Sequence, residues 1–517
     1  MPEYIRALIA ILVLSLPVFW LGRAPVCELA IDKADFRIRR NLWLLITVVA
    51  FLGRNFWIYA VIAGALLAIG GAKDSNRFSL YLFLLFVVPP FSAQIPGAGG
   101  INYLIDVDYL RLLSLTLLLP AYIALRSHEE TISFGRTWAD RWLLAYLLLQ
   151  LILQGSVDTA TNTMRSGFYA FIDVLLPYYV ASRSLRNLQA CRDALTSFVF
   201  AALLMAPVAA FEYAKHWLLY STLPGALGVN FGMGNYLSRG DSLRALAATG
   251  HSIVLGYVML VALSTYTFVY RSISRRASAL AILAMLIVGL ITPVSRGPWV
   301  GAAAALVIVM LTGPNKLSRI GRLTAIAIPT LAVLLVSPYS EKIIDLVPFV
   351  GTVDDFNVTY RQRLFEVSIS VLMNNPIFGS FDFWSAPQMQ EMIQGEGIID
   401  MVNSYLGIAL SYGLVGFTMF SAVFLCAAWG TVKGMRATEP GTELHDLGRA
   451  LLAALVGALV TIATVSSILV VPTIYWLIAG LCVGYGSLVA TQRSEWASTM
   501  PAAAFAHRAA GTRGALT

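Results

Sequence analysis

The sequence contains few charged residues: Asp, Glu, Lys and Arg make up 12% of its 517 residues, whereas 58% are hydrophobic. Soluble domains carry about twice that charged fraction, so the composition excludes an ordinary soluble protein. A chain of this kind folds in lipid, because the hydrocarbon core accepts apolar side chains and penalises charges. We therefore expect an integral membrane protein.

The sequence also lacks the short motifs of several enzyme classes. It has no GxxxxGK[ST] phosphate loop, no GxGxxG motif after a strand, no HExxH motif and no cluster of Cys and His. ATP hydrolysis, dinucleotide chemistry and zinc catalysis therefore lack support. Asp106-Val107-Asp108 matches the Asp-x-Asp metal motif of nucleotide-sugar transferases, but three residues in a short loop are a weak signal. We expect no metal and no cofactor.

Long apolar stretches follow one another up to about residue 490, each close to the 20 or so residues that one membrane crossing needs. We predict an all-α fold with a single polytopic membrane domain over residues 1–490, about 14 transmembrane helices, and a disordered cytoplasmic tail over 491–517. Residues 41–72 form either two spans or one kinked helix. The predicted spans lie near 4–22, 41–53, 55–72, 78–93, 109–126, 141–155, 164–182, 193–213, 245–270, 277–294, 297–312, 322–338, 403–430, 448–469 and 471–490.

The net charge of +8 comes from basic residues that are spread over alternate loops. This spread argues against a nucleic-acid partner, which would favour one basic patch. If the spans alternate, the basic loops all lie on one side of the membrane, and the positive-inside rule makes that side cytoplasmic. These loops contain residues 37–40, 73–77, 183–192, 271–276, 316–322 and 433–436.

Two loops on the other side are long, 214–244 and 339–402. Long ordered loops on a rigid scaffold often carry function. The second loop contains YRQRLFEVSISVLMNN, residues 360–375, in which apolar residues recur at helical spacing. We therefore predict that this extracytoplasmic loop carries short amphipathic helices that lie near the membrane surface.

Four arginines fall on this extracytoplasmic side: Arg244, Arg296, Arg361 and Arg363. Arginine is permanently charged, and its planar fork of donors suits bidentate binding of phosphate oxygens. If the four converge, they form a clamp for a diphosphate. The alternative for each is contact with lipid headgroups or solvation of a helix face. Arg296 favours function, because it lies in a Ser-Arg-Gly-Pro-Trp turn too short to need a solubilising charge.

Two other side chains in these segments are candidates for acid–base chemistry. His251 stands at the entrance to a predicted span, where a histidine is either a hydrogen-bonded packing residue or a catalyst. Glu366 is within two helical turns of Arg361 and Arg363, so it either forms an ion pair with one of them or acts as a general base.

Four segments in order resemble the O-antigen polymerase and ligase superfamily. LRALAATGHSIVLGYVML (243–260) resembles its arginine-containing entry to a span, and SRGPWVGA (295–302) its Ser-Arg-Gly-x-Trp turn. YRQRLFEVSISVLMNNPIFGS (360–380) resembles the segment that ends in Asn-Pro-x-x-Gly, and VNSYLGIALSYGLVG (402–416) the helix after the long loop. The resemblance covers mainly residues 240–430.

This resemblance implies a metal-independent glycosyltransferase at the periplasmic face of a bacterial inner membrane. The donor would be a glycan on undecaprenyl diphosphate and the acceptor a lipid-linked repeat unit, with membrane lipids and a chain-length-determinant protein as further partners. The general base is left open between Glu366, His251, Asp354 and Asp355. The implied catalytic residues are Arg296, Arg361, Glu366 and His251, and the implied substrate-binding residues are Arg244, Arg363, Asn403 and Tyr405.

One position distinguishes the branches of the family. The ligases resemble a pattern that begins with histidine; here Asn403, Gly413 and Gly416 match, but Val402 stands at the histidine. Valine cannot transfer a proton or donate a hydrogen bond, so we favour a polymerase of exopolysaccharide over a ligase. A flippase of lipid-linked oligosaccharide is the other alternative; it predicts two similar halves and charges near mid-membrane, and the sequence shows neither.

Overall fold

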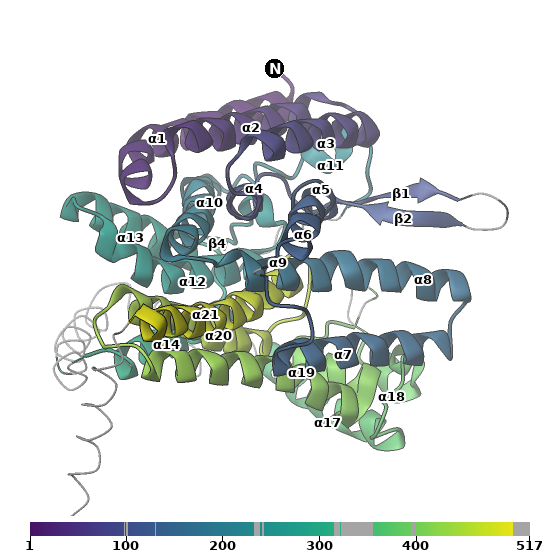
Figure 1. Ribbon diagram of the computed structural model, residues 1–517. Helices are drawn as coiled ribbons and strands as arrows, with labels where there is room; N and C mark the ends of the chain where they lie inside the picture. The colour runs from purple at the N-terminus through teal and green to yellow at the C-terminus, as the bar shows by residue number, and fades with distance from the viewer. Residues whose placement is uncertain are drawn as a thin grey trace, which may run out of the picture.

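The computed structural model of the chain (Figure 1) describes residues 1–97, 99, 102–129, 131–231, 238–239, 242–314, 321, 355–393, 397 and 399–499. In these residues almost all regular structure is helical, which confirms the predicted all-α class. The strands form two small antiparallel hairpins, β1 (Ala93–Pro96) with β2 (Tyr103–Val107) and β3 (Ser238–Arg239) with β4 (Ser242–Leu243).

The long helices lie roughly side by side along one direction (Figure 1). The N-terminal part contains α1 (Glu3–Leu29), α2 (Lys33–Leu52), α3 (Phe56–Lys73), α4 (Arg77–Leu84), α5 (Tyr109–Leu113), η1 (Ser114–Leu118), α6 (Leu119–Arg126), α7 (Trp138–Gly155), α8 (Ala160–Tyr169), η2 (Ala170–Leu175), α9 (Leu176–Ser184) and α10 (Leu188–Lys215). The rest contains α11 (Leu223–Leu227), η3 (Ala247–Thr249), α12 (Ser252–Val269), η4 (Tyr270–Ser272), α13 (Arg276–Ile291), α14 (Arg296–Leu311), α17 (Asp355–Asn374), η5 (Phe383–Ser385), α18 (Pro387–Gln390), α19 (Ser404–Arg436), α20 (Glu443–Ile462) and α21 (Val471–Thr499).

Eight helices in the described residues are long and apolar enough to cross a membrane, and α13 and α14 are shorter apolar helices. The chain is therefore a multi-pass membrane protein, although the predicted number of about 14 spans is not established. The eight are Glu3–Leu29, Phe56–Lys73, Tyr109–Arg126, Leu188–Lys215, Ser252–Ser272, Ser404–Arg436, Glu443–Ile462 and Val471–Glu495. The predicted span 322–338 lies outside the described residues. α21 extends into the predicted tail as far as Thr499.

The predicted span at 78–93 is wrong. α4 ends at Leu84, and the chain continues without helix to Pro89 and Pro90. Its apolar side chains from Leu80 to Val88 are all buried against other helices. Non-helical backbone is tolerated at membrane depth only where protein covers it, so this apolar run packs against protein and not against lipid.

The stretch 41–72 forms two helices and not one kinked helix. α2 ends at Leu52, Arg54 adopts a left-handed backbone with φ of 50°, and Asn55 starts α3 by accepting from the backbone N–H groups of Trp57 and Ile58. A polar cap that satisfies the first orphan donors of a helix is a strong start signal.

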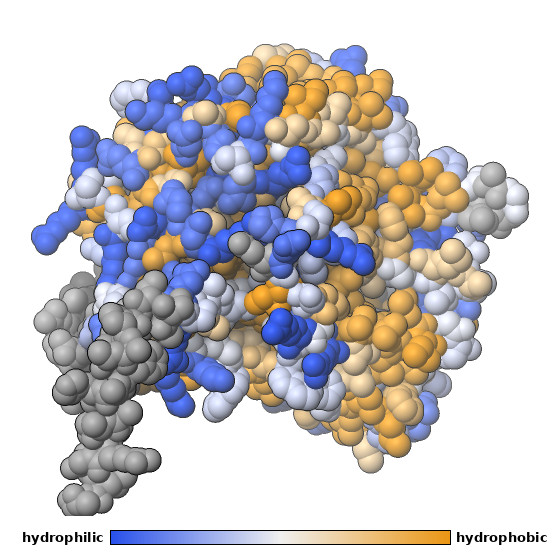
Figure 2. Space-filling view, viewed as in Figure 1, coloured by the Kyte–Doolittle hydropathy of each residue, from blue (hydrophilic) through white to orange (hydrophobic). Residues whose placement is uncertain are grey.

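Contacts between distant loops gather the basic segments at one end of the bundle. Gln189 donates to the carbonyl of Ala30 (2.8 Å), and Arg271 donates to the carbonyl of Gly441 (3.2 Å). Arg192 also forms an ion pair with Glu443. We call this end, with its loops 27–33, 184–192, 271–276 and 437–443, the basic end. Figure 2 shows hydrophilic residues gathered over it, on the side of α13.

A buried ion cluster joins three helices at the basic end. Arg39, which is fully buried, donates from Nε to Asp74 (2.8 Å) and from Nη1 to Asp193 (2.5 Å) and Ser197 (2.9 Å). Because burying a charge without a partner costs several kcal/mol, this network fixes how α2, the end of α3 and α10 meet.

The N-terminus lies at the other end of the bundle. Glu3 accepts from the indole of Trp217 (3.1 Å), and Tyr4 accepts from Arg54 (2.9 Å). We call this end, which also carries the loops around 52–56 and 216–251, the opposite end. The sequence alone left the side of the N-terminus open. If the basic end is cytoplasmic, the chain begins on the extracytoplasmic side.

Candidate functional site

The opposite end brings Arg244 next to the turn that contains Arg296. The backbone N–H of Ala245 donates to the carbonyl of Thr292 (3.3 Å), and Arg244 Nε donates to the carbonyl of Pro293 (3.1 Å). Pro293 is three residues before Arg296, the first residue of α14. The loop before α12 and the loop before α14 therefore lie side by side.

The start of α14 in turn packs against the loop that follows α20. A Cβ on Gly297 would come within 2.5 Å of Thr464 Oγ1, so only glycine allows this approach. The next residue, Val465, accepts from both the backbone N–H (3.2 Å) and the hydroxyl (2.7 Å) of Ser404, the first residue of α19. The helix starts of α14 and α19 are thus held against one loop.

Asp400 links this region to α17. Its carboxylate accepts from the hydroxyl of Ser466 (3.1 Å), and its carbonyl accepts from the hydroxyl of Tyr360 (3.2 Å). The charges of Asp400 and Arg296 both act on the neighbouring Arg361. Loss of hydration lowers the pKa of Arg361, Asp400 raises it, and the positive charge of Arg296 lowers it further. Arg361 is therefore within electrostatic reach of one carboxylate and one other guanidinium group.

A chain of contacts thus links four of the predicted residues, Arg244, His251, Arg296 and Arg361, with Asp400. We call these five residues the arginine site. They come from segments separated by up to about 150 residues of sequence, and the loops that carry them are joined by the contacts described above.

Three helices begin at the arginine site: α12 behind His251, α14 at Arg296, and α19 behind Asn403. The first N–H groups of a helix lack intrahelical partners and carry partial positive charge. Helix starts of this kind bind phosphate and carboxylate groups. The side chains of His251 and Asn403 already cap α12 and α19, whereas α14 has no side-chain cap. The start of α14 therefore adds most directly to the positive potential of the arginine side chains, and the site is suited to an anion.

His251 is held as a neutral imidazole. Its Nδ1 accepts from the backbone N–H of Ile253 (3.2 Å), which caps α12 and leaves the proton of the neutral ring on Nε2. Burial, and secondarily the charge of Arg244, lowers its pKa to about 4. A neutral imidazole with this tautomer donates a hydrogen bond through Nε2 and is a weak base at neutral pH.

The structure separates Arg363 and Glu366 from the arginine site. Arg363 pairs with Glu391 at 3.1 Å on the surface, where both side chains are more than half exposed. Glu366 is exposed and forms no ion pair or hydrogen bond with a described residue. In a helix, residues five apart differ by about 140° around the axis, so Glu366 and Arg361 face different directions.

Asn403 and Tyr405 serve the start of α19. The side chain of Asn403 accepts from the backbone N–H groups of Tyr405 (2.9 Å) and Leu406 (3.3 Å). The hydroxyl of Tyr405 donates to the carbonyl of Leu459 in α20 (3.0 Å), and its ring packs against that of Phe417. Both residues lie at the edge of the arginine site with their polar atoms engaged in helix capping and packing.

The remaining acidic candidates are placed as follows. Asp354 lies outside the described residues, and Asp355 begins α17. Asp108 caps α5 by accepting from the backbone N–H of Arg111 (2.8 Å), and Arg111 donates to Asp173 (2.9 Å). The Asp-x-Asp motif at 106–108 is therefore part of an ion-paired cluster at the start of a span.

Glu212 is a residue that the sequence reasoning missed. It is fully buried in α10, and its carboxylate accepts from the backbone N–H groups of Leu219 (3.0 Å), Leu246 (2.9 Å) and Ala247 (2.8 Å). The last two belong to the loop between Arg244 and His251. The sequence did contain a signal for Glu212, because it is a carboxylate within an apolar run, and ionisable residues in a span have a specific role.

A backbone clasp fixes the other side of the site. α19 is broken at Gly413 (φ 66°, ψ −170°), and the chain after α17 fills the break. Pro376 and Ile377 accept from the backbone N–H groups of Leu414 (2.9 Å) and Val415 (3.1 Å), and Ser380 donates to Leu410 (2.8 Å). The Asn-Pro-x-x-Gly segment therefore anchors α17, and with it Arg361, to α19.

Comparison with known proteins does not extend the resemblance. Neither a scan of protein-family models nor a search of curated proteins finds a match to this sequence. The relation to O-antigen polymerases and ligases therefore stays a prediction from the four segments quoted above. All four contribute residues to the arginine site or to its edge.

Proposed function

We propose that the protein is a metal-independent polysaccharide polymerase that extends lipid-linked glycan at the extracytoplasmic face of a bacterial inner membrane. The observation that supports this proposal is that Arg244, Arg296 and Arg361 lie on neighbouring segments at a point where three helices begin. A diphosphate bound there would form charge-assisted hydrogen bonds to the guanidinium groups.

The donor in this proposal is a growing glycan on undecaprenyl diphosphate. A hydroxyl oxygen of the acceptor repeat unit attacks the anomeric carbon, and the bond from that carbon to the diphosphate oxygen breaks. Negative charge develops on the leaving diphosphate. Arg296 and Arg361, with Arg244 beside them, stabilise that charge in the transition state. His251 contributes a hydrogen bond from Nε2, in keeping with its neutral form.

The proton of the acceptor hydroxyl needs a base. Glu366 faces away from Arg361, and His251 is a weak base, so neither suits this role in the described arrangement. Asp400 is the carboxylate whose charge acts on Arg361. We assign Asp400 as the group that accepts this proton, which then passes to solvent, since the side chain is exposed.

The two ends of the bundle support the proposed location. The arginine site lies at the opposite end, and the positive-inside rule makes the basic end cytoplasmic. The site would then face the periplasm, where lipid-linked repeat units are displayed. A chain-length-determinant protein would be the partner that sets product length.

The test is reconstitution of the purified chain in liposomes with undecaprenyl-diphosphate-linked repeat units, with products resolved on a gel. We expect a ladder of longer lipid-linked glycans that disappears in Arg296→Ala, provided that this variant keeps its elution volume and melting temperature. Transfer of glycan only to a lipid A core acceptor would instead establish a ligase. Movement of repeat units across the bilayer without extension would establish a flippase and refute the proposal.

A further inference from the structure

α17 has apolar residues on two opposite faces. Its inner face is buried against α18 and α19 through Leu364 and Val371. On its outer face, Phe365 is 53% exposed, Ile369 40% and Met373 69%. Residues four apart lie one above the other on a helix, so these three side chains form one outward stripe. A helix that touched only protein and water would carry polar residues there.

The outer face changes character along the helix. Its middle carries the exposed polar residues Gln362 and Glu366. Toward the C-terminus the large exposed side chains are the apolar ones of Ile369 and Met373, beside the small polar residues Ser370 and Asn374. Beyond the helix, Ile377 and Phe378 are also more than half exposed. The apolar surface therefore belongs to the last turns of α17, from Ile369 onward, and to the segment that follows the helix.

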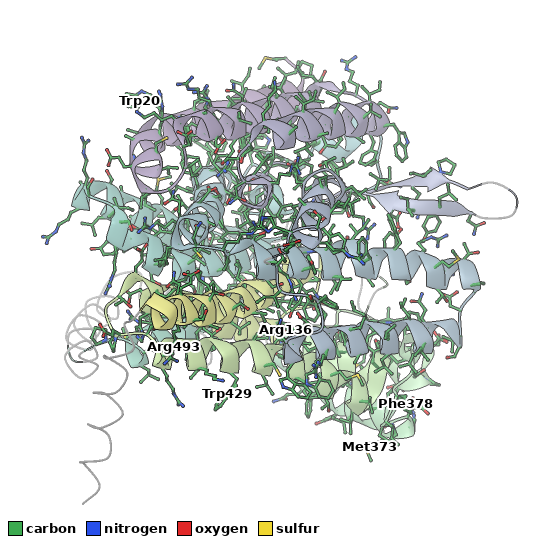
Figure 3. All side chains as sticks on the ribbon, viewed as in Figure 1. Trp20, Arg136, Met373, Phe378, Trp429 and Arg493 are labelled. Atoms are coloured by element: carbon green, nitrogen blue, oxygen red, sulfur yellow. The ribbon has the colours of Figure 1, made fainter. Side chains whose placement is uncertain are left out.

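This surface adjoins a helix that also exposes apolar side chains and is long enough to span a membrane. Ile377 is joined through its carbonyl to Val415 of α19, directly after the break at Gly413. From there α19 exposes Leu425 and Trp429, which lie one turn apart on one face of a helix long and apolar enough to cross a membrane. Figure 3 shows Met373, Phe378 and Trp429 along the same outer side of the molecule.

We propose that the last turns of α17, from Ile369 onward, are inserted together with Ile377 and Phe378 into the outer half of the bilayer. The occupant of this surface is lipid, because the surface adjoins that of α19 and carries large apolar side chains of the kind that interfacial helices bury among acyl chains. The part of α17 that contains Gln362 and Glu366 lies at the level of the headgroups. The stripe is a membrane anchor, distinct from the inner face that packs on the protein.

The anchor also sets the depth of the arginine site in the membrane, and the meaning of that depth rests on the proposed function. Arg361 is twelve residues before Met373, or about 18 Å along the helix. With Met373 among the acyl chains, Arg361 is held near the headgroup level. A diphosphate whose polyprenyl tail stays in the bilayer occupies the same level.

The test measures immersion depth without any glycan. Single cysteines are placed at Ile369, Met373 and Phe378 in a chain whose four native cysteines are replaced by alanine or serine, and each is labelled with a nitroxide in liposomes. Collision of the label with oxygen, which partitions into lipid, is compared with collision with a water-soluble nickel chelate. Gln362→Cys, an exposed position on the polar part of the same helix, is the matched control.

We expect oxygen to collide more often than the nickel chelate with labels at 369, 373 and 378, and the reverse for the label at 362. A surplus of nickel collisions at all four positions would place the stripe in water and overturn the proposal. Protection from both reagents at 373 and 378 would show that a protein covers the stripe, which also overturns it. Neither result depends on glycan transfer, so the proposed function is judged separately.

Discussion

Arg361 and Arg363 show that the direction in which a residue points around a helix decides which groups it meets. They are two positions apart in α17, which separates them by about 200° around the axis. Both side chains are exposed, but Arg361 lies within electrostatic reach of Arg296 and Asp400, whereas Arg363 pairs with the exposed Glu391. Exposed pairs contribute about 0–1 kcal/mol, so the two arginines differ in what their loss costs.

His251 predicts a specific pH dependence of stability. At pH 7 the ring is neutral in both folded and unfolded chain. As the pH falls below about 6.5, the unfolded chain binds a proton that the folded chain refuses down to about pH 4, so the free energy of unfolding decreases over that window. His251→Asn keeps the helix cap and removes the titration.

We expect His251→Asn to match the wild type at pH 7 and to lose less stability at pH 5, by about 1–2 kcal/mol. Melting temperatures in detergent at the two pH values measure this, since the other titrating groups are common to both proteins. An equal loss in both proteins would show that His251 is protonated as readily in the folded chain as in the unfolded one.

Glu212 is predicted to position the loop between Arg244 and His251. Glu212→Gln keeps the size of the side chain but leaves an NH₂ group facing backbone N–H donors. We expect a loss of about 2–3 kcal/mol in stability and a fall in glycan transfer that exceeds the fraction of unfolded protein. Glu391→Gln, at an exposed carboxylate, is the matched control and should change neither. Full transfer by folded Glu212→Gln would show that the loop keeps its place without this carboxylate.

At the scale of elements, the clasp between α17 and α19 explains a motif whose physical meaning the sequence did not disclose. The Asn-Pro-x-x-Gly segment was recognisable as a motif, yet its partner lies some 35 residues later. Hydrogen bonds between two irregular stretches of backbone leave no periodic trace in the side chains. The break in α19 could therefore not be predicted, although Gly413 itself was singled out.

Gly413→Ala tests the clasp. The backbone at Gly413 lies in a region open essentially to glycine alone, and an added Cβ would come within 2.2 Å of the carbonyl oxygen of Ile377. We expect a loss of at least about 3 kcal/mol. Gly430→Ala, in the same helix with no atom within 4 Å of the added Cβ, should be neutral or slightly stabilising. Equal melting temperatures for the two variants would contradict the clasp.

Helices that face lipid and segments that are buried in protein have the same composition, and this explains the wrong span at 78–93. Residues 80–88 are as apolar as any span but are enclosed by other helices. The start of a helix was predictable where a capping residue precedes it. Asn55 caps α3 and Asn403 caps α19, and asparagine is preferred at this position because its side chain accepts from the first backbone N–H groups.

At the scale of the whole molecule, the alternation of basic loops predicted which segments share an end. It placed Arg244, Arg296 and Arg361 on one side, and the structure brings them to the opposite end. It could not predict that Glu366 faces away from Arg361. The side of the membrane on which a loop lies gives the end of the bundle, but it does not give the direction of a side chain around a helix. Asp400 was missed because nothing in its local sequence marks it.

Substitutions at the basic end should lower stability, whereas substitutions at the arginine site should lower glycan transfer. Arg39→Met leaves Asp74 and Asp193 buried without their cation, and removing one partner of a buried network costs about 3–5 kcal/mol. We expect a large drop in melting temperature and, in the fraction that stays folded, glycan transfer per molecule close to that of the wild type. A selective loss of transfer in a stable variant would tie the basic end to the reaction.

The central claim is that Arg361 acts on the leaving diphosphate. The most direct measurement is the initial rate of glycan extension in liposomes for Arg361→Ala and Arg363→Ala, two changes of identical chemistry in the same helix. The account predicts a rate about 100-fold or more below wild type for Arg361→Ala and a rate within about twofold for Arg363→Ala. Equal rates for the two variants would contradict it.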